Sequence, residues 1–130
     1  MILALRTDKP EAELYLYADA KEQVDSLTWL AHRELSDTLL EKIEILLKRN
    51  SQSLDKITGI CVYKGPGSFT GLRIGITVAN TLAYSLQIPI IGSTGDTWLT
   101  NCLRNLTVQS RTTAILPEYG SEAHITQPRK

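Results

Sequence analysis

Residues 63–75 read Tyr-Lys-Gly-Pro-Gly-Ser-Phe-Thr-Gly-Leu-Arg-Ile-Gly. The apolar run at residues 57–63 predicts a short buried strand before the glycines, and the pattern after them predicts a helix over residues 68–86. A glycine-rich turn between a strand and a helix invites comparison with phosphate-binding loops. Here Gly71 is followed by Leu72 instead of lysine, and the glycine spacing also departs from the dinucleotide motif. The stretch therefore indicates an α/β fold and argues against phosphate binding by this turn alone.

The predicted helix carries small residues at every fourth position, namely Gly71, Gly75, Ala79 and Ala83. Glycine inside a helix costs roughly 1 kcal/mol relative to alanine, so two of them require a packing reason. A row of small residues lets another helix approach closely. The apolar positions of this helix span about 200°, which is wider than one core-facing stripe needs. We expect part of this arc to face the sheet, and the rest to face either the helix at residues 35–49 or a partner protein.

Upstream of this unit, residues 1–7, 11–18 and 23–32 carry strand patterns. Their short connections predict an antiparallel meander, because parallel neighbours need longer crossovers. From residue 35 the hydrophobic period becomes helical. The predicted core-facing stripe consists of Leu35, Leu39, Leu40, Ile43, Leu46 and Leu47.

Capping residues predict where the outer helices begin. Ser36, Asp37 and Thr38 are candidates for the helix over residues 35–49, and Ser93 or Thr94 for a last helix that continues through residue 103. Residues 87–92 predict a fifth strand. The resulting order, βββαβαβα, with right-handed crossovers gives an α/β fold with a mixed five-stranded sheet. We expect one domain over residues 1–106, with residues 107–130 as linker and C-terminal tail.

Composition restricts the function classes. The chain has 130 residues, a formal net charge of zero and 42% hydrophobic residues, which suits a single domain and argues against a basic nucleic-acid binder or a polybasic membrane-surface protein. Cys61 and Cys102 lack metal-ligand spacing, so we expect two buried thiols in a reducing compartment. No signal peptide or membrane-spanning run is evident. The sequence therefore predicts a soluble, cytoplasmic protein.

Residues 65–75, Gly-Pro-Gly-Ser-Phe-Thr-Gly-Leu-Arg-Ile-Gly, closely resemble the signature of the bacterial TsaB (YeaZ) family, which belongs to the machinery that makes threonylcarbamoyladenosine in tRNA. Supporting similarity surrounds them, in the opening strand, the first helix and the strand at residues 87–92, so that the resemblance covers roughly residues 1–105. It implies a single actin-like ATPase (ribonuclease H-like) lobe.

The sequence departs from the family pattern at three places. Where the family has Asp-Thr-Ser after its first strand, this chain has Arg6-Thr7-Asp8, and a cation there would repel Mg²⁺. The family's His-Ser before the first helix is Leu35-Ser36 here. Family members also have a second lobe of about equal size, so we expect a shortened form that lacks this lobe and retains the tail.

The resemblance implies a non-catalytic accessory subunit that binds the homologous TsaD catalytic subunit through two helices, with no catalytic, cofactor-binding or metal-binding residue of its own. The interface residues it suggests are Leu35, Leu39, Ile43, Gly71, Leu72, Gly75, Ile76, Ala79 and Ala83. Gly75→Arg should then block the complex and leave the fold intact. A TsaE-like ATPase is the expected third protein, tRNA is contacted only indirectly, and the isolated chain can form a homodimer through the same helices.

Other functions fit the residues less well. An actin-like nucleotide-binding lobe of a phosphotransferase or ATPase is the enzyme alternative, which Arg6 opposes. A metallopeptidase needs paired ligands such as His-Glu-x-x-His, a spacing that His32 and His124 do not have. Direct tRNA binding has only scattered support from Arg104, Arg111 and the C-terminal charges.

Overall fold

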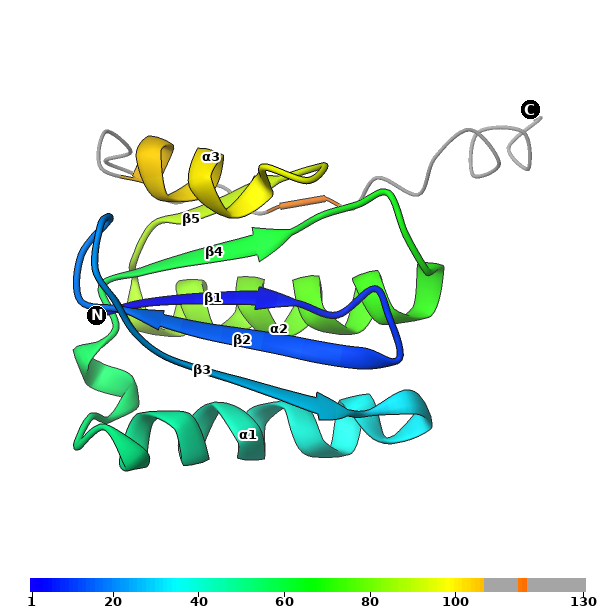
Figure 1. The fold of residues 1–130 in the computed structure, drawn as a ribbon, viewed down its shortest axis with the longest axis horizontal. Helices are drawn as coiled ribbons and strands as arrows, with labels where there is room; N and C mark the ends of the chain where they lie inside the picture. The colour runs from blue at the N-terminus through cyan, green and yellow to red at the C-terminus, as the bar shows by residue number, and fades with distance from the viewer. Residues whose placement is uncertain (107–114, 117–130) are drawn as a thin grey trace.

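The computed structural model describes residues 1–106 and 115–116. Most of the predicted tail, residues 107–130, lies outside the described residues. Within these residues, five strands and three α-helices follow the predicted order βββαβαβα (Figure 1). The strands are β1 (Ile2–Arg6), β2 (Glu11–Tyr17), β3 (Gln23–Leu30), β4 (Gly59–Tyr63) and β5 (Ile90–Ser93). The α-helices are α1 (Leu35–Arg49), α2 (Phe69–Leu86) and α3 (Trp98–Leu106), and short 3-10 turns lie at His32–Glu34 and Leu54–Lys56.

The strands form one mixed sheet in the order β3-β2-β1-β4-β5. β1, β2 and β3 pair antiparallel, which confirms the predicted meander. β4 pairs parallel with β1 and with β5, so the helical crossovers that the sequence predicted connect the parallel strands.

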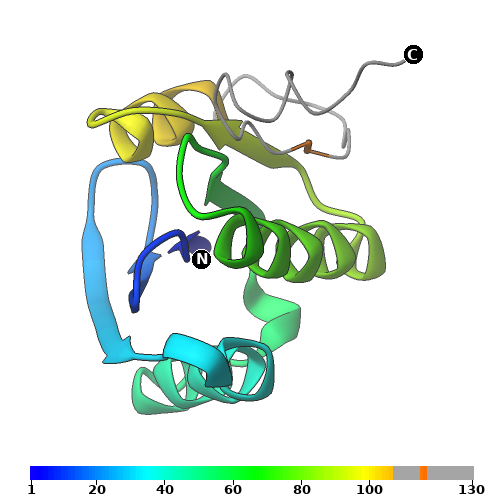
Figure 2. The ribbon, with the colours of Figure 1, turned by 90° about the vertical axis from the view of Figure 1, so that its right-hand side faces the viewer.

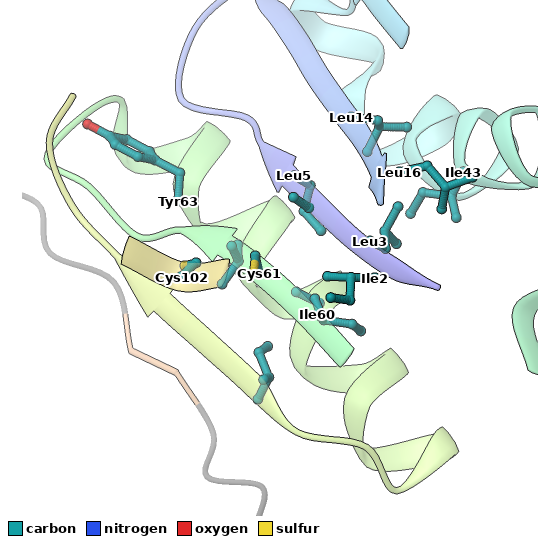
Figure 3. Close-up of a cluster of buried hydrophobic side chains, with 14 of the residues drawn as sticks. Ile2, Leu3, Leu5, Leu14, Leu16, Ile43, Ile60, Cys61, Tyr63 and Cys102 are labelled. Carbon is teal, nitrogen blue, oxygen red and sulfur yellow. The ribbon is translucent and has the colours of Figure 1, made fainter. Parts of the chain in front are cut away.

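Two helices cover one face of the sheet and the third covers the other (Figure 2). α1 packs on β2 and β3, α2 packs on β1 and β4, and α3 packs on β4 and β5. Residues alternate between the two faces, as a pleated sheet requires. On the side of α1, the fully buried Leu3, Leu16 and Ile43 meet (Figure 3).

The opposite face holds the two cysteines. Cys61 of β4 and Cys102 of α3 are fully buried free thiols, which confirms the prediction that each packs as a small apolar residue. The thiol of Cys102 donates to the carbonyl oxygen of Ile91 at 3.3 Å. Hydrogen bonding with Cys102 and burial both raise the pKa of the Cys61 thiol, so the protonated form is favoured there.

Helix α1 has the predicted bounds, but two details of its sequence interpretation are wrong. Leu40, assigned to the core stripe, is 47% exposed, while the other five residues of the predicted stripe are buried. The residue before the helix is Glu34, and no side chain caps the helix. The hydroxyl of Thr38 instead donates to the carbonyl oxygen of Glu34 at 2.8 Å and accepts a bond from Trp29 Nε1 at 3.0 Å.

The fifth strand begins later than predicted because Gln87 ends helix α2. Gln87 has a left-handed φ of 55° and its N–H donates to the carbonyl oxygen of Tyr84. Such a residue closes a helix and cannot belong to a strand. Consequently β5 starts at Ile90 and includes Ser93, which therefore does not cap α3.

Candidate functional site

The glycine-rich stretch joins β4 to α2 at the end of the sheet where β1 also ends. Gly65 has a φ of 123°, a value that favours glycine. The hydroxyl of Tyr63 donates to the carbonyl oxygen of Pro66 at 2.7 Å and so ties the end of β4 to the turn. α2 then runs back along the sheet (Figure 1).

The glycines of this stretch accommodate the residues that follow β1. A Cβ atom on Gly71 would lie 2.1 Å from the carbonyl oxygen of Thr7, and one on Gly67 would lie 2.6 Å from the Cβ atom of Asp8. Thr7 is 2% exposed, and its hydroxyl donates to the carbonyl oxygen of Gly71 at 2.7 Å. The signature glycines therefore allow direct packing of the helix on the β1–β2 turn.

Arg6 is part of the same arrangement. Its Nε donates to Asp8 Oδ1 at 2.7 Å, and its guanidinium carbon lies 3.9 Å from the centre of the Tyr63 ring. The Asp8 side chain is only 6% exposed, so the cation balances a largely buried carboxylate. The sequence predicted that Arg6 would repel a metal ion but missed its pairing with Asp8, two residues away and therefore on the same side of an extended chain.

The structure corrects the interpretation of the small-residue row. Gly71 and Gly75 face Thr7, and Ala79 and Ala83 are fully buried. The row therefore packs on the chain's own β1 end and sheet, and neither a neighbouring helix nor a partner protein is needed to explain it. Gly75→Arg is accordingly a poor test of partner binding, because any side chain at Gly75 meets Thr7.

The nine residues suggested for the interface are mostly inside the domain. Leu35, Leu39, Ile43, Leu72, Gly75, Ile76, Ala79 and Ala83 are buried, and Gly71 is half-buried. Buried side chains cannot form a contact surface in the folded chain. These residues instead hold α1 and α2 on the sheet, and a surface on the helix pair must be made by their neighbours.

The neighbours form an apolar strip between α1 and α2, which run side by side (Figure 2). On α2 the strip contains the half-buried Ile74, Val78, Leu82 and Leu86, spaced four residues apart. On α1, Glu44 lines a cleft together with Leu86 of α2. Leu40 lies one turn before Glu44 and therefore on the same flank of α1. We call Leu40, Ile74, Val78, Leu82 and Leu86 the helix-pair strip.

Hollows lie at both ends of the helix-pair strip. At the helix C-termini, a cleft of about 530 Å³ is lined by Leu47, Leu54 and Leu86 with the polar Glu44 and Lys48 at its rim. Near the helix N-termini, a second hollow of about 360 Å³ is lined by Thr7, Asp8, Leu35 and Ile74, among others. The face formed by the helix pair is therefore uneven and partly apolar along its whole length.

In residues 1–106 and 115–116, no three His, Cys, Asp or Glu side chains gather as a metal site would require. No helix within this part of the chain is long and apolar enough to cross a membrane.

Comparison with known proteins identifies the family. The family model for TsaD, tRNA N6-adenosine threonylcarbamoyltransferase, matches residues 29–95, from the end of β3 through α1, β4 and α2 to the loop after β5. The chain belongs to this family. The solved structure of YeaZ from Pseudomonas aeruginosa superposes with a TM-score of 0.65 and 30% identity, over 72% of this chain and 43% of that one. The fold is thus a single actin-like, ribonuclease H-like lobe, as the sequence predicted.

Relatives carry two different names. The tRNA threonylcarbamoyladenosine biosynthesis protein TsaB of Escherichia coli (strain K12) is 35% identical over 91 residues, 70% of this chain and 38% of that protein. A tRNA N6-adenosine threonylcarbamoyltransferase of Geotalea daltonii is 38% identical over 63 residues, 48% of this chain and 18% of that protein. The predicted resemblance to TsaB (YeaZ) is confirmed. The chain spans less than half the length of these relatives.

Proposed function

We propose that this chain is an accessory subunit in threonylcarbamoyladenosine synthesis, and that its helix-pair strip binds a TsaD-like catalytic subunit. The observation that carries the proposal is the exposed Leu40 beside the apolar row of α2. Apolar side chains gathered at the surface of a small domain mark a site of protein association.

Homology within the family supports a TsaD-like partner. The TsaD family model matches the region that contains both helices of the pair. A TsaD-like protein therefore carries an equivalent pair, and two similar pairs can associate about an approximate two-fold axis into a four-helix arrangement. By the same reasoning, the isolated chain can pair with itself, while a TsaE-like ATPase and tRNA would join through the complex.

Two matched substitutions on α1 test the docking surface. Leu40 and Ile45 are 47% and 41% exposed. They lie on opposite flanks of the helix, because Leu40 shares the flank of Glu44, which lines a cleft with Leu86 of α2, and Ile45 shares the flank of Thr38 and Arg49, which bond to β3. We expect Leu40→Glu to weaken binding to the TsaD-like subunit from the same organism at least about tenfold, and Ile45→Glu to change it less than about threefold. Isothermal titration measures both affinities. Unchanged binding by Leu40→Glu would overturn the proposed surface.

Reconstitution tests the accessory role separately. Threonylcarbamoyl transfer to tRNA is measured with the TsaD-like subunit and TsaE-like ATPase, with and without this chain. We expect the chain to stimulate transfer and Leu40→Glu to stimulate it less. Equal transfer with and without the chain would exclude the accessory role even if binding occurs.

A further inference from the structure

Helix α2 also has a side that faces β5, away from the helix-pair strip, and there it contacts the segment at residues 115–116. The Ile115 N–H donates to Asn80 Oδ1 at 2.9 Å, and Asn80 Nδ2 donates to the carbonyl oxygen of Ile115, also at 2.9 Å. One side-chain amide therefore satisfies both backbone groups of a single residue, as a neighbouring strand would. Figure 1 shows this segment in orange beside β5.

The side chain of Ile115 occupies space that Gly92 leaves open. A Cβ atom on Gly92 would lie 2.7 Å from Ile115 Cγ2. Ile115 is half-buried and packs against the core, whereas the next residue, Leu116, is 77% exposed. The contact therefore selects one residue of the segment.

Asn80 and Gly92, the two residues that contact Ile115, are each unfavourable in the element that contains them. Asparagine in the middle of a helix competes with the backbone for hydrogen bonds, and glycine inside a strand weakens it. Asn80 and Gly92 belong to different elements, yet their irregularities meet at one residue of the chain.

We propose that Asn80 and Gly92 form a binding slot for one residue of an extended chain, with the Asn80 amide recognising its backbone and Gly92 admitting an apolar side chain. The occupant is the chain's own Ile115. α3 ends at Leu106 on the opposite face of the sheet, so occupation of the slot holds Ile115 against α2 and β5, on the other side of the sheet from the end of α3. The slot is separate from the helix-pair strip and does not depend on the proposed TsaD-like partner.

Hydrogen exchange of the full-length chain, followed by NMR, tests whether Ile115 occupies the slot. We expect the Ile115 amide to exchange at least about tenfold more slowly than an unprotected amide, and Asn80→Ala to remove this protection. Alanine is the better helix former, so loss of protection cannot result from a weakened α2. Ile115→Gly should behave like Asn80→Ala, Leu116→Gly should retain protection at residue 115, and the Ile60 amide in β4 should stay protected throughout.

Binding in trans tests whether the slot recognises a peptide. A synthetic peptide of residues 111–120 is added to the full-length Ile115→Gly variant, and the Asn80 side-chain amide signals are followed. We expect saturable shifts with this peptide and none with a peptide that has glycine in place of Ile115. Equal exchange of residue 115 in the unmodified chain and the Asn80→Ala variant, or no response to the peptide, would overturn the slot.

Discussion

The hydroxyl oxygen of Thr7 lies 2.0 Å from the position that a Cβ atom on Gly75 would occupy. Thr7 cannot simply turn away, because this hydroxyl is buried and donates to the carbonyl oxygen of Gly71. Gly75, the second residue of the small-residue row, is therefore required by the end of β1, and it lies on the side of the helix that faces away from solvent.

Gly75→Ala should destabilise the fold by about 2 kcal/mol or more, since the new methyl group must displace Thr7. In a Thr7→Ala background the cost should fall by at least about 1 kcal/mol, because the nearest remaining atom, the Cβ of residue 7, lies 3.1 Å away. Urea unfolding of the four chains measures this coupling. Gly95→Ala is the control, because a Cβ atom on Gly95 would have nothing within 4 Å and only the φ of 79° opposes alanine there. If the costs of the substitutions at positions 7 and 75 are purely additive, Thr7 is not the reason for glycine at position 75.

Arg6→Ala should cost about 2 kcal/mol, because it leaves the largely buried Asp8 carboxylate without its cation. The Arg6→Ala/Asp8→Asn double variant should recover part of this loss. Lys9→Ala provides a comparison, since the Lys9–Glu13 pair involves a lysine that is 49% exposed and should contribute no more than about 0.5 kcal/mol. Similar losses for Arg6→Ala and Lys9→Ala would show that Arg6 acts only as a surface charge.

Periodicity predicted the elements of this fold because each has an apolar pattern that the core requires. It could not predict which neighbour a small residue faces, because close approach to Thr7 and close approach to another helix require the same glycines. The interface suggested from the sequence was for this reason placed on residues that are buried, such as Gly75 and Ile76. The exposure of Leu40 depends on how α1 is rotated against α2, which periodicity does not determine. The contact of Asn80 with Ile115 likewise depends on tertiary structure. Asparagine is an unfavourable residue within a helix, however, and its presence at position 80 was a sequence signal that its side chain has a specific partner.

Thr38, which the sequence offered as a capping candidate for α1, instead makes two other hydrogen bonds, to the carbonyl oxygen of Glu34 and from Trp29 Nε1. Thr38→Val should cost about 1 kcal/mol, because it removes the acceptor of Trp29 Nε1 and the bond to Glu34 while keeping the side-chain shape. Thr38→Ser keeps the hydroxyl and should cost less. In a Trp29→Phe background the cost of Thr38→Val should decrease, as measured by thermal unfolding; an undiminished cost would mean that Trp29 does not use this hydroxyl.

Asp25 provides a pH-dependent link between β3 and the end of α1. Hydrogen bonds from Arg49 and Asn50 lower the pKa of Asp25 from its usual 3.8 to about 2. Because the pKa is lower in the folded state than in the unfolded state, this carboxylate stabilises the fold above about pH 4 and loses its contribution as the pH falls toward 2. The Arg49 side chain is 45% exposed, so solvent screening weakens this contribution. Asp25→Asn should therefore be less stable than the unmodified chain at pH 6, and the difference should shrink steadily between pH 4 and pH 2 in urea unfolding. Comparing the two chains at each pH cancels the titration of all other carboxylates, and a difference that stays constant down to pH 2 would contradict the role of the Arg49–Asp25 pair.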